Sequence, residues 1–188
     1  MSGWRVLGVD ASPAGTGIAR PDGGHETWIN KLKAKEPTGA RLTFLYDHAT
    51  ALLDEHRVDL VVIEAYNYGL KKFGDVFGIG EAAGVIKLAI AQRGIPLVSV
   101  SPGGRAKFAT GTGRGNKDLV LSEWSRITGV DFAGDHNQAD ASVLRELGMH
   151  LLGEPTYQLS SDRLLALTAV KKNPWNAAAL KLTKERAA

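Results

Sequence analysis

The pattern of apolar and polar residues along the first half of the chain predicts a sheet. Segments 5–10, 16–20 and 26–31 are short and rich in apolar and β-branched residues, and the Ser-Pro-Ala-Gly and Pro-Asp-Gly-Gly sequences between them are typical of turns. We therefore expect three antiparallel strands. Segment 59–64 is an uninterrupted apolar run, typical of a strand covered on both faces, and segment 96–100 is predicted to be a fifth strand.

Helical periodicity begins after the third predicted strand. Between residues 38 and 56, leucines and alanines recur at steps of three and four, and Thr38 is a suitable N-cap. Three further helices are expected at about 80–93, 116–128 and 135–152, each followed by a glycine that ends it. We expect loops at 65–80 and 101–115. The order of the elements predicts an α/β fold, a central mixed five-stranded sheet with helices on its faces.

The pattern also divides the chain into a body and a tail. Residues 1–153 are predicted to form one domain, and residues 154–188 a weakly helical, loosely attached tail that Pro174 interrupts. From Lys171 onward the tail has five basic residues and one acid, although the whole chain carries a net charge of only +3. Such a tail is compatible with a polyanionic partner, and equally with a solubilising, frayed chain end.

Composition excludes several classes of protein. The 188 residues include no cysteine, which excludes a disulfide scaffold, a zinc ribbon and thiol chemistry. With 44% hydrophobic residues the chain is too apolar to be disordered, yet none of its apolar runs approaches the length of a membrane span. The N-terminus has no charged-then-apolar leader, so we expect a cytoplasmic protein without membrane contacts.

Three acidic residues occupy positions where sites assemble in α/β folds. Asp10 ends the first predicted strand, Glu64 ends the fourth, and Asp140 lies near the start of a late helix. If the two strands are neighbours, Asp10 and Glu64 face one another at one edge of the sheet. Clustered carboxylates repel unless a cation intervenes, and hard oxygen ligands favour Mg²⁺ or Mn²⁺ over zinc. Each acid taken alone is more typical of a cap or a solvated element end.

Two further residues are candidates for a fourth metal ligand. His136 lies four residues before Asp140 and shares a helix face with it, as does Asn137 three residues before. Asp135 lies off that face, but at the helix entrance it is close enough to turn inward. Asp135 is also a good N-cap, and His136 is equally typical of a solvated helix start. Asp135 and His136 therefore remain rivals.

A basic, glycine-rich segment precedes the helix at 116–128. Arg105, Lys107, Arg114 and Lys117 fall within thirteen residues that contain no acid. The glycines between them let the backbone approach a phosphate closely, and the following helix N-terminus favours anions. The spacing is not that of a nucleotide-binding Walker loop, so no nucleotide cofactor is expected. The alternative interpretation is a flexible surface loop.

Aromatic residues follow Glu64. Tyr66 and Tyr68 are candidates for stacking on unpaired bases, or else they pack at the rim of the sheet. For Phe73 and Phe77 we expect rim packing. The tryptophans are also expected to be packing residues: Trp4, Trp28, Trp124 and Trp175.

These residues together resemble the RuvC-type Holliday junction resolvases of the RNase H-like superfamily, in a phage-like form. The resemblance rests on five short motifs that occur in the family's order over residues 5–150. They are Leu7–Asp10 with Gly15–Gly17, Val61–Glu64, Gly80–Val85, Lys107–Lys117 and Ala139–Ala141. The resemblance implies an RNase H-like fold and a homodimer that nicks four-way or other branched DNA junctions.

The resemblance also implies roles for individual residues. Asp10, Glu64 and Asp140 match metal-binding carboxylates, which implies Mg²⁺ (or Mn²⁺ as a substitute), with two ions that hydrolyse a phosphodiester bond. Lys107 and Lys117 match basic residues that contact the DNA backbone near the cut. Tyr66 or Tyr68 matches a ring inserted at the junction centre.

One departure from the family pattern keeps other functions open. The family commonly has an acid or a histidine three residues before the last aspartate, where this chain has Asn137. The alternative to a nuclease is therefore a branched-DNA-binding module that does not cut. A phosphotransferase of the actin and sugar-kinase group also begins with a strand ending in Asp, but its second half needs far more chain than 188 residues.

Overall fold

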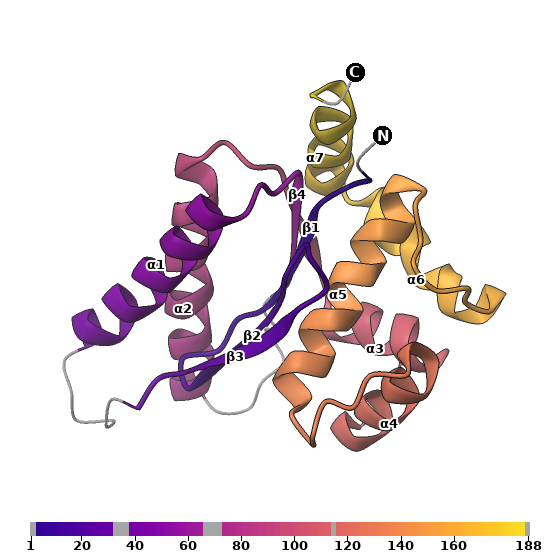
Figure 1. Cartoon of the computed structure of the whole chain (residues 1–188), viewed down its shortest axis with the longest axis horizontal. Coiled ribbons are helices and arrows are strands. Elements are labelled where there is room, and N and C mark those ends of the chain that lie inside the picture. Colours follow the sequence, from indigo (N-terminus) through magenta and orange to yellow (C-terminus); the bar gives the residue numbers. More distant parts are fainter. Residues whose placement is uncertain (1–2, 32–37, 66–72, 114–115, 187–188) are drawn as a thin grey trace.

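The structure is a computed structural model that describes residues 3–31, 38–65, 73–113 and 116–186. Its strands are β1 (Val6–Asp10), β2 (Gly15–Ala19), β3 (His25–Ile29), β4 (Leu60–Glu64) and β5 (Leu97–Val100). Its helices are α1 (Thr38–Glu55), α2 (Phe73–Gln92), α3 (Pro102–Thr110), α4 (Lys117–Thr128), α5 (His136–Leu152), α6 (Ser161–Lys172) and α7 (Pro174–Glu185). Figure 1 shows the helices on both sides of a twisted sheet.

The sheet has the order β3-β2-β1-β4-β5. β1, β2 and β3 pair antiparallel, and β4 and β5 then run parallel to β1. The two parallel connections both cross over through a helix, which is α1 before β4 and α2 before β5. The predicted mixed five-stranded α/β sheet, with three antiparallel strands followed by parallel ones, is confirmed.

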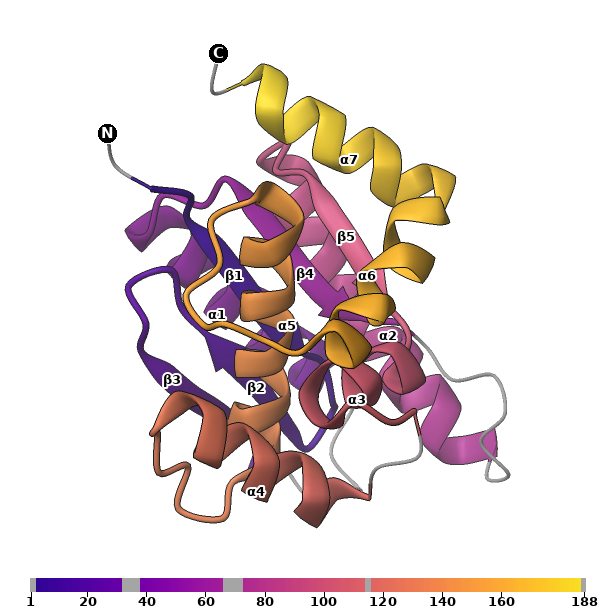
Figure 2. The ribbon, with the colours of Figure 1, turned by 90° about the vertical axis from the view of Figure 1, so that its right-hand side faces the viewer.

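Side chains alternate between two apolar cores, one on each face of the sheet. Val6 and Val62 belong to the core shared with α3, α4, α5 and α6, whereas Leu7 and Val61 belong to the core under α1 and α2. All four are almost fully buried. Figures 1 and 2 show α1 and α2 on one side of the sheet and α5 crossing the other side.

Two glycines let α5 lie directly on the sheet. A Cβ atom at Gly8 of β1 would lie 2.1 Å from the backbone oxygen of Ala141, and one at Gly17 of β2 would lie 2.0 Å from that of Asn137. Neither position has room for a side chain. This close contact places Asp140, one residue before Ala141, against the sheet near the end of β1.

The structure differs from the predicted loop at 101–115, since residues 102–110 form α3. Ser101 is its N-cap, accepting a hydrogen bond from the backbone nitrogen of Gly104, and Pro102 occupies the first turn. Gly111 ends the helix in the left-handed conformation, with φ 83°. The serine, proline and glycines that are typical of a turn are here the start and stop signals of a short helix. α2 also begins earlier than expected, at Phe73.

The tail is not loosely attached, and that prediction is wrong. Leu180 of α7 and Val170 of α6 are buried in the same core as β5. Asn176 is 2% exposed, and its side-chain amide donates to the backbone oxygen of Ser99 and accepts from its backbone nitrogen, both at 2.9 Å. β5 is an edge strand, so α7 covers an edge that has no strand partner (Figure 2).

The aromatic predictions are confirmed in part. Trp124 is fully buried and Trp28 is 7% exposed. Trp4 packs against the core that contains Trp124. Trp175 is 83% exposed and Phe77 68% exposed, so these two residues do not pack as expected. Sequence position alone does not reveal which face of a helix meets the body. None of the helices among the described residues combines the length and apolar character that crossing a membrane requires.

Candidate active site

Asp10 and Glu64 lie side by side because β1 and β4 are parallel neighbours. Val9 pairs with Ile63, so the next residue of each strand stands at the same edge of the sheet. Val9 and Ile63 face the core under α1 and α2. By strand alternation Asp10 and Glu64 therefore face the opposite side, toward α3 and α5. The condition on which Asp10 and Glu64 were expected to meet, that the two strands are neighbours, is therefore fulfilled.

Asp140 reaches the same place from α5, and Arg105 reaches it from α3. Asp140 is 2% exposed and Arg105 is 8% exposed. The Arg105 guanidinium donates from Nε to Oε2 of Glu64 and from Nη1 to Oδ1 of Asp140. One arginine thus joins the end of a strand to the second turn of a helix, in a setting where the charged groups have little contact with water.

The electrostatics show that the three carboxyl groups act on one another. Burial raises the pKa of Glu64 to about 7, Arg105 lowers it in part, and the negative charge of Asp10 raises it again. Burial likewise raises the pKa of Asp140 to about 7, against the lowering effect of Arg105. The pKa of Asp10 is also raised, mainly by burial. Each group is held in a site where an additional cation would favour its charged form.

The donor set fits a hard divalent cation, although the side chains are turned toward Arg105. Within the described parts of the chain, no three carboxylate or imidazole side chains are arranged around one point as metal ligands. Three carboxyl groups nevertheless lie around a single buried guanidinium, whose pKa all three raise. Oxygen donors without thiols suit Mg²⁺ or Mn²⁺.

The structure distinguishes the two rivals for a fourth ligand. Asp135 is the N-cap of α5: its Oδ1 accepts from the backbone nitrogens of Asn137 and Gln138, and its Oδ2 accepts from Oγ1 of Thr27 at 2.7 Å. Burial raises the pKa of Asp135, but these hydrogen bonds outweigh burial and lower the pKa below its ordinary value. Both oxygens therefore already have structural partners.

His136 is less committed to the fold. Its Nε2 lies 3.4 Å from Oδ1 of Asp118 on α4, an exposed carboxylate. Its Nδ1 is buried and has no hydrogen-bond partner among the residues described. Asn137, at the family position, packs against β2 beside Gly15 and Gly17.

The basic residues divide into three groups. Lys117 is exposed at the start of α4, where Asn116 is the N-cap, and its charge offsets part of the rise in the pKa of Asp10 and Asp140. Lys107 is half-buried in the last turn of α3. Arg105, expected to bind DNA, is buried against the carboxylates instead. Arg114, Tyr66 and Tyr68 lie outside the described residues.

Arg105 is the functional residue that sequence reasoning placed differently. Its assignment to a phosphate-binding loop rested on the expected loop at 101–115. The available signal was the Ser-Pro start of a helix, after which Arg105, Ala106, Phe108 and Ala109 share the buried side. A helix that buries these positions turns the Arg105 side chain inward.

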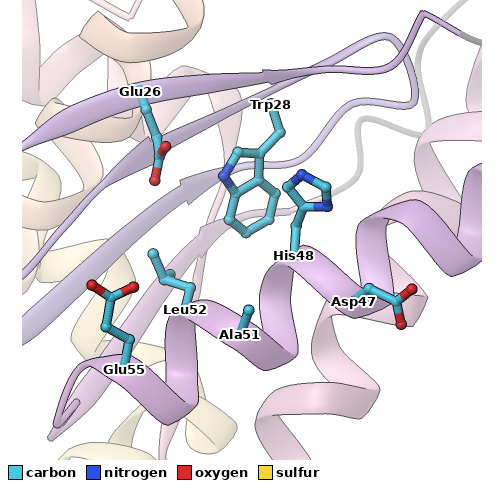
Figure 3. Close-up of a pocket in the computed structure, with 7 residues that line it drawn as sticks. All are labelled: Glu26, Trp28, Asp47, His48, Ala51, Leu52 and Glu55. Carbon is cyan, nitrogen blue, oxygen red and sulfur yellow. The ribbon is translucent and has the colours of Figure 1, made fainter.

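A separate pocket of about 380 Å³ lies between β3 and α1, on the other face of the sheet (Figure 3). The residues that line it are Glu26, Trp28, Asp47, His48, Ala51, Leu52 and Glu55. The Trp28 and His48 rings pack at 5.6 Å, and Asp47 points away from them. This pocket holds no part of the Asp10, Glu64 and Asp140 cluster.

Comparison with known proteins matches the chain to one family. The family model described as crossover junction endodeoxyribonuclease RuvC matches residues 6–142. The chain is 32% identical over 137 residues to the protein of that name from Gloeobacter violaceus, covering 69% of this chain and 78% of the relative. It is 32% identical over 136 residues to the protein of that name from Nocardia farcinica, covering 69% of this chain and 71% of the relative.

A solved structure shares the fold. It is titled T. thermophilus RuvC in complex with Holliday junction substrate, and it matches with a TM-score of 0.66 and 18% identity over 82% of this chain and 99% of that one. A second Thermus thermophilus RuvC structure matches with a TM-score of 0.60 and 19% identity, over 82% of this chain and 98% of that one. The phage-like character stays a prediction. By its sequence matches, the chain belongs to the RuvC family of crossover junction endodeoxyribonucleases.

Proposed function

We propose that this chain is a metal-dependent endonuclease that hydrolyses phosphodiester bonds in four-way DNA junctions or other branched DNA. The observation that carries the proposal is the convergence of Asp10, Glu64 and Asp140, from two strands and a helix, at one sheet edge beside the exposed Lys117. Membership of the resolvase family supports the substrate class.

The three carboxylates would hold the metal. Mg²⁺ is the proposed ion and Mn²⁺ a substitute, with two ions in each site. Bound divalent ions supply Lewis acidity that activates water and stabilises the leaving oxygen. His136 is the better candidate for a further ligand than Asp135, because both Asp135 oxygens have structural partners whereas the Nδ1 atom of His136 has none in the described chain.

The remaining site residues would position the DNA. Lys117 stands exposed at a helix N-terminus near the carboxylates, where a phosphate is favoured by both the ammonium group and the helix dipole. Lys107 and Arg114 are proposed to contact the DNA backbone on either side of that phosphate. Tyr66 and Tyr68 are proposed to stack on unpaired bases at the junction centre, since they lie two and four residues after Glu64 in the sequence.

A homodimer is the proposed assembly. Phe77 and Leu88 of α2 are 68% and 52% exposed, and their spacing of eleven residues places them on the same face of the helix. Two symmetric cuts require two active sites, and a second copy of the chain supplies the other one. Packing of α2 on α2 of the second copy would cover both apolar side chains.

The test is cleavage of a labelled synthetic four-way junction in Mg²⁺ by the wild type and Asp10→Asn, with Asp47→Asn on the exposed face of α1 as matched control. We expect Asp10→Asn to lose cleavage and keep junction binding, and the control to keep both. Cleavage retained by Asp10→Asn refutes the assignment. Wild type that binds junctions but yields no product in Mn²⁺ indicates the alternative, a binding module that does not cut.

A further inference from the structure

Arg105 stands where a cation would have to bind. Its side chain extends from α3 to the end of β4 and to α5, where it contacts Glu64 with Nε and Asp140 with Nη1. These are two of the three carboxylates to which the metal is assigned above. With 8% of Arg105 exposed, solvent has little access to the guanidinium.

The charge of Arg105 is permanent. An arginine side chain does not lose its proton in a protein, so it remains a fixed positive charge among the three acids. A buried carboxylate without a partner strongly destabilises a fold, and the pairing with Glu64 and Asp140 removes part of that cost. In the metal-free protein, the guanidinium is therefore the counter-ion that keeps the carboxylates together.

A divalent ion and the guanidinium cannot share these positions. The oxygens that Arg105 contacts, Oε2 of Glu64 and Oδ1 of Asp140, belong to two of the three carboxyl groups that would hold the metal, so the guanidinium would compete with a metal for them. If a dication bound the same carboxyl groups, it would lie close to the guanidinium, and the repulsion between the two positive charges would be large even after screening.

We propose that Arg105 is a built-in competitor of the metal: its guanidinium holds Glu64 and Asp140 in the metal-free protein and must withdraw before a divalent cation binds. This inference rests on the proposed function, since it requires the metal to bind at these carboxylates. It makes Arg105 a positioning residue of the metal-free state, and it predicts that the wild type binds metal more weakly than its carboxylates alone allow.

The test measures Mn²⁺ affinity by isothermal titration calorimetry and thermal unfolding with EDTA or Mn²⁺, using wild type, Arg105→Gln and Arg105→Lys. Arg105→Gln is expected to bind Mn²⁺ at least about tenfold more tightly, because one repelling charge is gone. It should unfold at a lower temperature than wild type in EDTA and recover in Mn²⁺. The lysine variant keeps the charge but lacks the fork that spans two carboxylates, so we expect an intermediate affinity.

The matched control is Arg163→Gln. It removes an arginine of α6 that is 9% exposed and forms an ion pair at 2.7 Å with Glu123 of α4. It should lower stability and leave Mn²⁺ affinity unchanged. Equal or weaker Mn²⁺ binding by Arg105→Gln than by wild type overturns the proposal. If Arg105→Gln does not fold, the lysine variant decides, and an affinity equal to that of wild type overturns it.

Asp10→Asn separates this inference from the proposed function. If Asp10→Asn abolishes Mn²⁺ binding and the Arg105 variants leave it unchanged, the role of Arg105 is refuted and the metal site stands. If neither Asp10→Asn nor any Arg105 variant alters Mn²⁺ binding, the metal site itself is refuted, and both proposals fail.

Discussion

Neutralising Asp140 should stabilise the metal-free protein, although the residue is assigned to catalysis. Asp140 is 2% exposed, and burial is the main cause that raises its pKa from 3.8 to about 7. The folded state therefore favours the protonated group. This contribution to stability is fully present below about pH 4 and is lost as pH rises through about 7.

The magnitude follows from the pKa change. The difference between 3.8 and about 7 corresponds to about 4 kcal/mol between the two protonation states. Asparagine has the shape of the protonated group and no charge. Above pH 7, Asp140→Asn should therefore gain up to about 4 kcal/mol in free energy of unfolding, or roughly 10 °C in melting temperature for a chain of this size.

The assay is thermal unfolding in EDTA at pH 4.5 and pH 8, with Asp47→Asn as the exposed control. The gain from Asp140→Asn should be present at pH 8 and small at pH 4.5, and the control should change little at either pH. Saturating Mg²⁺ should stabilise the wild type and not the variant. An Asp140→Asn protein that is no more stable than wild type at pH 8 would contradict the electrostatic reasoning.

Three other predictions concern packing, the tail and the assembly. Gly8→Ala should destabilise the fold by about 3 kcal/mol, because its Cβ would meet the backbone oxygen of Ala141, whereas Gly39→Ala, with open space around it, should be nearly neutral in the same denaturant titration. If the tail binds DNA, the double variant Lys171→Glu, Lys172→Glu should bind junctions more weakly and with a flatter salt dependence, and an unchanged slope in a binding titration would exclude the contact. Phe77→Asp should convert the proposed dimer to a monomer in sedimentation velocity, with a melting temperature no lower than that of the wild type, and an unaltered dimer would show that α2 is not the interface.

The charge reversal is preferable to deletion of the tail. Leu180 and Val170 are part of the core, so removal of α7 would expose apolar surface and the edge of β5. The basic residues of the tail are also dispersed. Arg186 donates to the backbone oxygen of Gly94 at 2.6 Å. Gly94 precedes the first residue of β5, whereas Glu64 pairs with the last residue of that strand, so the two lie at opposite ends of the strands. Any DNA contact by Arg186 would therefore lie far from the proposed cleavage point.

The sequence by itself determined the sheet and the place of the acids. Apolar runs of strand length, turn residues between them, and glycines after the helices are local signals, and they located all five strands to within about two residues. Asp10 and Glu64 follow from those strands directly, because the residue that ends a parallel strand lies at the sheet edge where its neighbours also end. Its position near the start of a helix also makes Asp140 a candidate, although periodicity cannot place that helix on the sheet.

Only the tertiary structure decided how the acids are partnered. Gly8 and Gly17 allow α5 to lie on β1 and β2, and this close packing, invisible in a local pattern, brings Asp140 to the strand ends. Arg105 reads as a surface cation among glycines until α3 turns it toward Glu64 and Asp140. Burial then sets the pKa of each carboxyl group. These effects depend on distances between segments that are remote in sequence, so residue order indicates which groups are available and packing decides which of them meet.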